Sequence, residues 1–390
     1  MNQNRTPLFD AVRKYIDDDV IPFHVPGHKQ GRGLQELVGY IGEKALRMDV
    51  NGMEDLDFAN NPAGVILEAQ KLMADAYGAE DAYFLVNGTT SGVQTMILSA
   101  CDPGSRIIIP RNAHRSTVGG IILSGAMPVY VTPEINRDLG ITMGISAEKV
   151  REAIRKNPHA RAVFIINPTY YGMASDIKSI IRTAHMHDIP VIADEAHGAH
   201  MMFRDDFPLT AMEAGADMSA VSVHKTAGSL TQSSVLLSGD ALIPKERIRQ
   251  SLSLTFTSSA SYLLMCSLDI ARKQLATKGA ELLGKALGLA RWARDEINRI
   301  PGFYAFGREL AGQDGCFDFD ETKLGINVKQ TGYTGYQVEA LLRDRFNIQV
   351  EMSDLYNILA IVSIGDREED VTALVNALRQ LSPGRTGSKA

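Results

Sequence analysis

The feature that most constrains the fold is a series of short, continuous apolar segments separated by segments with helical periodicity. The apolar runs lie at 82–86, 106–109, 128–131, 162–166, 190–193, 218–223 and 234–237. Strands buried on both faces have this character, whereas a strand with one face in water alternates apolar and polar residues. Residues 64–78, 91–100 and 175–188 carry apolar side chains at helical spacing, with Ser175 as the expected N-cap of the third helix. The alternation predicts an α/β fold whose sheet is mainly parallel.

The pattern along the chain predicts three parts and a tail. Residues 1–60 are irregular, so we expect an N-terminal arm that wraps over a larger body. Residues 61–275 hold the apolar runs and form the expected large domain. Residues 276–381 are expected to form a smaller α+β domain, with strands near 325–328 and 359–364 and helices at 335–346 and 367–381. Residues 382–390 form an expected disordered tail.

Charge and cysteine content narrow the class of protein. A net charge of −6 over 390 residues argues against nucleic acid as the main partner, because binding the phosphate backbone of a nucleic acid needs a basic surface. The three cysteines form no C-x-x-C pair, and the first residues lack the apolar stretch of a signal peptide. No apolar run approaches the roughly 18 residues of a membrane span. We therefore expect a cytoplasmic protein with no membrane partner.

Two residues at the ends of neighbouring apolar runs indicate the chemistry. Asp194 ends one run and Lys225 follows the next, 31 residues later. That spacing leaves room for one crossover and puts both groups at the carboxyl ends of adjacent strands, where α/β proteins bind ligands. A lysine amine forms a Schiff base with an aldehyde, and a carboxylate keeps a pyridine nitrogen protonated. The pair therefore predicts pyridoxal 5'-phosphate as the cofactor, against the alternatives of a surface lysine and a loop-capping carboxylate.

Further residues supply the other contacts that this cofactor needs. Hydroxyls and N–H groups at the start of the helix near 91 make an anion site, with Thr90 and Ser91 as the main expected phosphate donors and Ser222 as another. An ordinary Ser/Thr N-cap is the competing interpretation. His114 follows a strand and could stack on the ring, and His197 lies three residues after Asp194. For each histidine a structural role competes.

Three other interpretations fail on spacing. Asp194-Glu195-Ala196-His197 resembles a helicase motif, but the chain lacks the matching phosphate loop, because His224 stands where that loop needs glycine. The histidine pairs 185/187 and 197/200 match no metal motif, and no third ligand is obvious, so no metal is expected. Gly31-Arg32-Gly33 does not continue to a third glycine, which excludes a dinucleotide fingerprint there.

Seven motifs together resemble the fold-type I pyridoxal-phosphate family that holds the bacterial ornithine, lysine and arginine decarboxylases. They are residues 22–29 (PFHVPGHK), 87–92 (NGTTSG), 111–116 (RNAHRS), 167–172 (NPTYYG), 194–200 (DEAHGAH), 222–226 (SVHKT) and 351–354 (EMSD). The resemblance covers about residues 8 to 381 and implies an aspartate aminotransferase-like fold with a large parallel-sheet domain and a smaller C-terminal domain. Compared with longer members, the chain has the form of a short member without the extra N-terminal and C-terminal domains.

The resemblance also implies roles for individual residues. Lys225 would be the Schiff-base lysine, Asp194 would pair with the ring nitrogen and His114 would stack on the ring. The phosphate would be held by Thr89, Thr90, Ser91 and Ser222, and His224 and His197 would lie near the cofactor. Thr257 and Ser258 would reach the phosphate from a neighbouring subunit, so a homodimer with shared active sites is the smallest unit implied, and a larger homo-oligomer is possible.

The expected function is α-decarboxylation of a basic amino acid, either lysine, ornithine or arginine, to CO2 and a diamine or agmatine, as in polyamine biosynthesis. Either Lys225 or His224 would return a proton to Cα. Charge complementarity suggests that Glu351 or Asp354 binds the distal cation of the substrate. Two alternatives stay open: another pyridoxal-phosphate reaction such as transamination or aldol cleavage, and a non-catalytic cofactor-binding protein.

Overall fold

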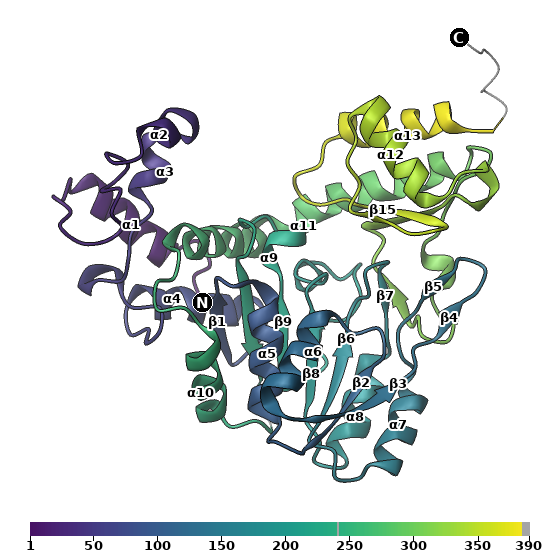
Figure 1. The fold of residues 1–390 in the computed structure, drawn as a ribbon, viewed down its shortest axis with the longest axis horizontal. Coiled ribbons are helices and arrows are strands. Elements are labelled where there is room, and N and C mark those ends of the chain that lie inside the picture. Colours follow the sequence, from purple (N-terminus) through teal and green to yellow (C-terminus); the bar gives the residue numbers. More distant parts are fainter. Residues whose placement is uncertain (240–241, 384–390) are drawn as a thin grey trace.

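The centre of the molecule is a seven-stranded sheet in the order β1-β10-β9-β8-β6-β2-β3. Figure 1 shows the computed structural model, which describes residues 1–239 and 242–383. The strands are β1 (Asp81–Leu85), β2 (Arg106–Pro110), β3 (Met127–Val131), β6 (Ala162–Ile166), β8 (Val191–Glu195), β9 (Met218–Val221) and β10 (Ser234–Ser238). Strand β10 pairs antiparallel with β1 and β9, and the other four pairs are parallel. The expected mainly parallel sheet is confirmed.

Both faces of this sheet are covered, which explains the continuous apolar runs. On β2, Ile107 and Ile109 belong to one buried cluster and Ile108 to another. The same alternation separates Ile192 of β8 from its neighbours Val191 and Ala193. Successive side chains of a strand point to opposite faces, so a strand between two helical layers needs apolar residues at every position.

The helices of the large unit are interspersed with its strands along the chain. They are α4 (Val65–Ala76), α5 (Gly88–Ala100), α6 (Arg115–Ser124), α7 (Ala147–Lys156), α8 (Ile177–His185), α9 (Val223–Thr226) and α10 (Lys245–Thr255). The expected cap of α8 is wrong by one residue. The Asp176 carboxylate accepts the Ser179 N–H, whereas Ser175 Oγ accepts the Ile145 N–H at 3.2 Å and joins a neighbouring loop. The run 218–223 also ends as a strand at Val221, because residues 223–226 form α9.

Helix α5 packs unusually close to the sheet through Gly92. A Cβ atom at Gly92 would lie 2.8 Å from Leu85 Cδ1 and 3.0 Å from Ala220 Cβ, closer than side-chain atoms normally approach. Glycine therefore allows the helix to rest on β1 and β9. The contact places the first turn of α5 at the carboxyl edge of the sheet.

The N-terminal 60 residues are more regular than their sequence suggested. They contain α1 (Pro7–Asp17), α2 (Gln35–Ile41), α3 (Glu43–Arg47) and the short turn η1 (Glu54–Leu56). In α1, Leu8, Val12 and Tyr15 recur at helical spacing and are buried. The carboxylate of Asp269 accepts the N–H groups of Leu8 and Phe9, and so caps α1 from a distant helix. Helices α2 and α3 stand away from the sheet, at the upper left of Figure 1.

The smaller unit is built on a four-stranded antiparallel sheet in the order β11-β13-β15-β14. Its strands are β11 (Tyr304–Ala305), β13 (Lys323–Asn327), β14 (Met352–Ser353) and β15 (Asn357–Ile361), with helices α12 (Gly335–Phe346) and α13 (Glu368–Leu381). Short pairs β12 (Asp318–Phe319) with β7 (Met173–Ala174), and β4 (Ile135–Asn136) with β5 (Ile141–Thr142), lie beside it. Single turns η2 (Met201–Phe203), η3 (Arg308–Leu310) and η4 (Lys329–Thr331) complete the description.

Helix α11 (Tyr262–Ile297) runs from the large unit to the smaller one (Figure 1). The division expected between residues 275 and 276 falls inside this continuous helix. Although α11 has 36 residues, neither it nor another helix of the described ranges is long and apolar enough to cross a membrane. At the other end of the chain, Ser382 is buried and donates its hydroxyl to the Pro301 carbonyl. Residues 384–390 of the expected tail lie outside the described residues.

Candidate active site

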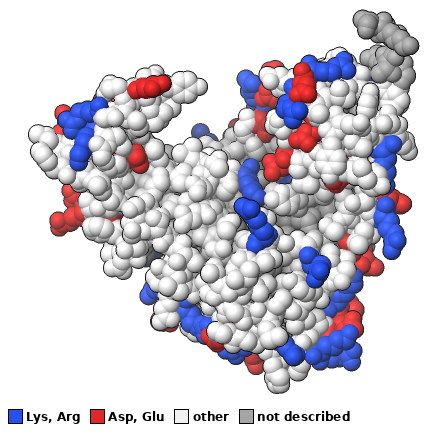
Figure 2. Space-filling model, in the orientation of Figure 1, with Lys and Arg blue, Asp and Glu red and all other residues white. Residues whose placement is uncertain are grey.

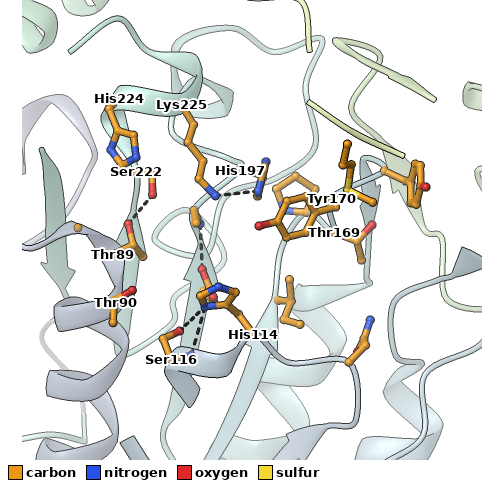
Figure 3. Close-up of a pocket in the computed structure, with 18 of the residues that line it drawn as sticks. Thr89, Thr90, His114, Ser116, Thr169, Tyr170, His197, Ser222, His224 and Lys225 are labelled. Carbon is orange, nitrogen blue, oxygen red and sulfur yellow. Dashed lines mark hydrogen bonds between the residues drawn. The ribbon is translucent and has the colours of Figure 1, made fainter. Parts of the chain in front are cut away.

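A cavity of about 580 Å³ opens at the carboxyl edge of the large sheet. Its walls come from the segments that follow β1, β2, β6, β8 and β9, together with Met352 of the smaller unit. Figure 2 shows this face of the molecule hollowed between the two units, and Figure 3 shows the side chains in the cavity. The predicted site residues that line it are Thr89, Thr90, His114, Asp194, His197, Ser222, His224 and Lys225.

Lys225 projects into the cavity from the single turn α9. Its Nζ lies 2.9 Å from His197 Nε2 and 5.3 Å from the centre of the Tyr170 ring (Figure 3). Burial lowers the pKa of Lys225, and the nearby carboxylates of Asp194 and Glu351 offset part of that effect. A lowered pKa increases the fraction of neutral amine, which is the nucleophilic form.

Asp194 ends β8 on the strand next to the one that leads to Lys225. Strands β8 and β9 pair in parallel with Asp194 opposite Ala220, which agrees with the neighbouring strands expected from the spacing. The carboxylate is buried, and its Oδ1 accepts the Ala196 N–H at 3.1 Å. Burial raises the pKa of Asp194, while the Ala196 N–H, Lys225 and His114 act in the opposite direction. A cationic partner in the cavity would hold this carboxylate ionised.

The first turn of α5 forms the end of the cavity suited to an anion. Thr90 is exposed to the cavity, and Thr89 Oγ1 lies 2.5 Å from Ser222 Oγ and donates to Ser234 Oγ at 3.0 Å. The N–H groups at the start of a helix carry partial positive charge and lack partners within the helix. Ser91 differs from the expectation: it is buried outside the cavity lining, and its hydroxyl donates to the Gly88 carbonyl at 2.8 Å.

His114 and His224 are each oriented by a hydrogen bond at Nδ1. The Ser116 N–H donates to His114 Nδ1 at 3.2 Å, so this nitrogen is an acceptor and caps α6. His224 Nδ1 lies 2.8 Å from the Ser233 carbonyl and therefore carries the proton of the neutral ring. Burial lowers the pKa of His224, the Ser233 carbonyl raises it and Lys225 lowers it further. The neutral ring then presents Nε2 as an acceptor.

Tyr170 is a site residue to which sequence reasoning gave no role. Its ring centre lies 4.1 Å from that of His197, and both rings flank the Lys225 amine. Tyr170 follows β6 by four residues, so the rule that ligands bind at carboxyl ends of strands could have identified it. Asn112, Thr169 and Tyr171 line the cavity for the same reason.

The two carboxylates considered for the distal end of the substrate have different surroundings. Asp354 is occupied: Tyr171 donates its hydroxyl to Oδ2 at 2.5 Å, and the N–H groups of Tyr356 and Asn357 donate to Oδ1 at 2.8 Å. Glu351 is exposed, and its charge raises the pKa of Lys225. The surroundings favour Glu351 as the carboxylate that can meet a cation.

Thr257 and Ser258 do not line this cavity. Ser258 is exposed and lines a second cavity with Tyr83, Arg249 and Phe256. Thr257 Oγ1 accepts the Ser259 N–H at 3.2 Å in the segment after α10. A single chain therefore does not bring these two residues to its own Lys225.

The residues of the cavity fit pyridoxal phosphate. A buried carboxylate, a lysine amine and a helix N-terminus with hydroxyls line one cavity, and they match the ring nitrogen, the aldehyde and the phosphate. His197 Nδ1 is also buried without a hydrogen-bond partner among the described residues. Buried polar atoms of this kind are rare unless a ligand or water completes them.

Comparison with known proteins agrees with this fit. The chain matches the family model described as Orn/Lys/Arg decarboxylase, major domain, over residues 6–370. It is 47% identical to arginine decarboxylase of Bacillus subtilis (strain 168) over 383 residues, which cover 98% of this chain and 78% of that protein. It is 25% identical over 439 residues to constitutive lysine decarboxylase of Escherichia coli (strain K12), covering 97% of this chain and 60% of that protein.

Solved structures share the fold at lower identity. Lysine decarboxylase of Francisella novicida superposes with a TM-score of 0.85 at 21% identity, covering 96% of this chain and 59% of that one. Serine palmitoyltransferase of Sphingomonas wittichii superposes with a TM-score of 0.65 at 13% identity, covering 89% of this chain and 81% of that one. These likenesses confirm the expected fold-type I architecture.

Proposed function

The chain belongs to the Orn/Lys/Arg decarboxylase family, and from this premise we propose that it converts arginine to agmatine and CO2. The cofactor of this family and fold class is pyridoxal phosphate. Four relatives named arginine decarboxylase are 45–47% identical to the chain, whereas three named lysine decarboxylase are 23–26% identical. This contrast favours arginine among the three basic amino acids.

The observation that carries the proposal is the placement of Lys225 and Asp194 in one cavity, at the ends of paired strands. When bound, pyridoxal phosphate supplies an electron sink for the electron pair that CO2 leaves at Cα. Asp194 would hold the ring nitrogen, and Thr89, Thr90, Ser222 and the first turn of α5 would hold the phosphate.

Proton delivery to Cα is assigned to Lys225 rather than His224. In the neutral ring of His224 the proton sits on Nδ1, toward the Ser233 carbonyl, and burial lowers the pKa of that ring. The Lys225 amine is inside the cavity and lies 2.9 Å from His197 Nε2. His197 therefore serves as the group that accepts a hydrogen bond from Lys225 and fixes its direction.

A second copy of the chain is proposed to complete the site. Thr257 and Ser258 lie outside the cavity of their own chain, and Ser258 is exposed beside a second cavity. The family resemblance assigns them to the phosphate of a neighbouring subunit. On this proposal the homodimer is the smallest active unit.

The direct test is product analysis. The protein loaded with cofactor is incubated separately with arginine, lysine and ornithine, and products are identified by mass spectrometry. We expect agmatine from arginine and little diamine from the other two. A diamine as the main product would move the assignment to lysine or ornithine, and an oxo acid would replace decarboxylation with transamination.

A further inference from the structure

A buried polar cluster that the proposed reaction does not use lies next to His197. It consists of Asp320, Lys323 and His200, whose side chains are at most 1% exposed. Asp320 Oδ2 lies 3.2 Å from Lys323 Nζ and 3.2 Å from His200 Nε2. The Asp320 Oδ1 atom accepts the N–H and the hydroxyl of Thr322. The carboxylate thus joins the first residue of β13 to a histidine of the large unit.

The cluster touches both chain segments that carry the reactive contact. Lys323 Nζ donates to the backbone carbonyl of His197 at 3.2 Å. His200 Nδ1 lies 3.0 Å from Thr226 Oγ1, and Thr226 follows Lys225 on α9. His197 and Lys225 come from segments after different strands, so a shared buried anchor can fix the separation of their side chains.

The energetic cost of this arrangement argues against a role in stability alone. Burying two charges removes their hydration at a large cost in free energy, and well-packed apolar residues in place of a buried pair are often neutral or stabilising. Burial raises the pKa of Asp320, but Lys323 and His200 more than offset that effect and lower it, so the carboxylate stays ionised. A buried, ionised pair that offers little net stability is better explained by the geometry it enforces.

We propose that Asp320, Lys323 and His200 are positioning residues that hold the His197 ring as a hydrogen-bond acceptor for the Lys225 amine. This inference rests on the proposed role of Lys225. The smaller unit thereby helps to orient the Lys225 amine without touching it. Lys323 acts through its hydrogen bond to the His197 backbone, and His200 acts through its contact with Thr226 on α9.

The charges around His197 support its role as a neutral acceptor. Burial, Lys225 and Lys323 lower the pKa of His197 well below its usual range, and Asp320 opposes them. A neutral ring can accept from the Lys225 ammonium through Nε2, which stabilises the protonated amine. The pKa of Lys225 is therefore set by burial, by the charges of Asp194, Glu351 and Lys323, and by the alignment of His197.

The test uses the charge-neutral double variant Asp320→Asn/Lys323→Met, which removes both charges of the pair together. The readout is the pKa of Lys225 in the cofactor-free protein, from the pH dependence of its reaction with acetic anhydride, quantified by peptide mass spectrometry. Loss of the Lys323 charge alone would raise this pKa. A net fall, which we expect to be about one unit, therefore reports that a misaligned His197 no longer stabilises the ammonium. The same double change in a His197→Phe background should give no further fall.

The matched control is Asp269→Asn/Arg272→Met. This pair is also fully buried and spaced i, i+3. Its hydrogen bonds hold the N-terminal segment at Arg5 and Leu8, not the segments that carry His197 and Lys225. It should leave the pKa of Lys225 unchanged. Circular dichroism checks that the first double variant folds. If it does not, His200→Gln serves in its place, and we expect a smaller fall in the pKa of Lys225.

Two outcomes would overturn the proposal. One is an unchanged Lys225 pKa in folded variants, and the other is an equal fall in the presence and absence of the His197 ring. Because the labelling needs neither cofactor nor substrate, these outcomes are independent of product analysis. Failure of the arginine assignment would leave the positioning result intact.

Discussion

Burial shifts the pKa values of two side chains of the cavity in opposite directions. It lowers the pKa of Lys225 and raises that of Asp194, because both charged forms lose hydration. Each group partly restores the charge of the other. The charge states of Lys225 and Asp194 therefore depend on what occupies the space between the two side chains. A cofactor with a cationic ring nitrogen suits the Asp194 end.

Removal of the Asp194 charge should slow the reaction strongly and change the stability of the fold much less. Asp194→Asn keeps the shape of the side chain but cannot stabilise a protonated ring nitrogen. We expect kcat to fall on the order of 10²–10³-fold, as for other lost electrostatic groups in enzyme sites. Steady-state kinetics with arginine checks this. The adjacent Glu195→Gln serves as control, because Glu195 bonds away from the cavity, and an equal loss in both variants would contradict the assignment.

The two carboxylates near the cavity mouth should respond differently to neutralisation. Glu351→Gln should raise the KM for arginine roughly two- to fivefold with little change in kcat, the range expected for an exposed ion pair. Asp354→Asn should instead lower thermal stability, because its carboxylate holds Tyr171 and two backbone N–H groups. An unchanged KM in both variants would remove distal binding by this segment as a proposal.

At the scale of elements, β8 delivers two consecutive carboxylates to opposite sides of the sheet. Asp194 faces the cavity, whereas Glu195 accepts hydrogen bonds from Ser219 Oγ at 2.6 Å, the Ala211 N–H at 2.9 Å and Asn167 Nδ2 at 3.0 Å. Asn167 leads into the segment that carries Tyr170. Because successive side chains of a strand point to opposite faces, Asp194 lies in the cavity and Glu195 bonds to residues that support it.

Glu195 should make stability depend on pH. Burial raises its pKa to about 7, above the ordinary 4.5, while its three donors offset part of the burial and Glu213 adds to it. The folded protein therefore keeps a proton that the unfolded chain has lost. Its contribution is fully present below about pH 4.5 and is lost as the pH rises through about 7, by roughly 3 kcal/mol.

Urea unfolding at pH 5, about 0.5 unit above the lower pKa value, and at pH 8, about 1 unit above the upper one, measures most of this contribution. The native protein should lose more stability between the two conditions than Glu195→Gln, whose amide does not titrate. Other groups titrate in both proteins alike, so the difference isolates Glu195. Equal losses in both proteins would contradict the prediction.

At the scale of the whole molecule, the proposed active site draws on segments that are distant in sequence. Lys225 belongs to the large unit, Met352 and Lys323 to the smaller unit, and Thr257 with Ser258 to the segment between α10 and α11. If a partner subunit supplies the last two, each active site combines residues from two chains.

Mixed dimers test this sharing. Lys225→Ala should be inactive, and Ser258→Asp should bind the cofactor poorly because its carboxylate repels the phosphate. Refolding the two variants together creates dimers with one site that has Lys225 and Ser258 intact, so about a quarter of the native activity should return. Separately refolded variants are the control. No recovery in a sample shown to contain mixed dimers would contradict a shared site.

The sequence by itself determined the strands of the large sheet, helices α4, α5, α8, α12 and α13, and the placement of Asp194 and Lys225 at the ends of neighbouring strands. These depend on local properties: runs buried on both faces are apolar throughout, and carboxyl ends of parallel strands share one edge. Thr89, Thr90, His114 and Ser222, which the motifs singled out, line the cavity.

Tertiary structure alone decided which of the neighbouring candidates face the cavity and what supports them. The contact of Gly92 with the sheet places α5, and Ser91 is buried outside the cavity lining. The capping of α1 by Asp269 and the contact of Lys323 with His197 join residues 261 and 126 positions apart. Local periodicity reports which face of an element is apolar, but a partner so distant in the chain is fixed only when the elements pack.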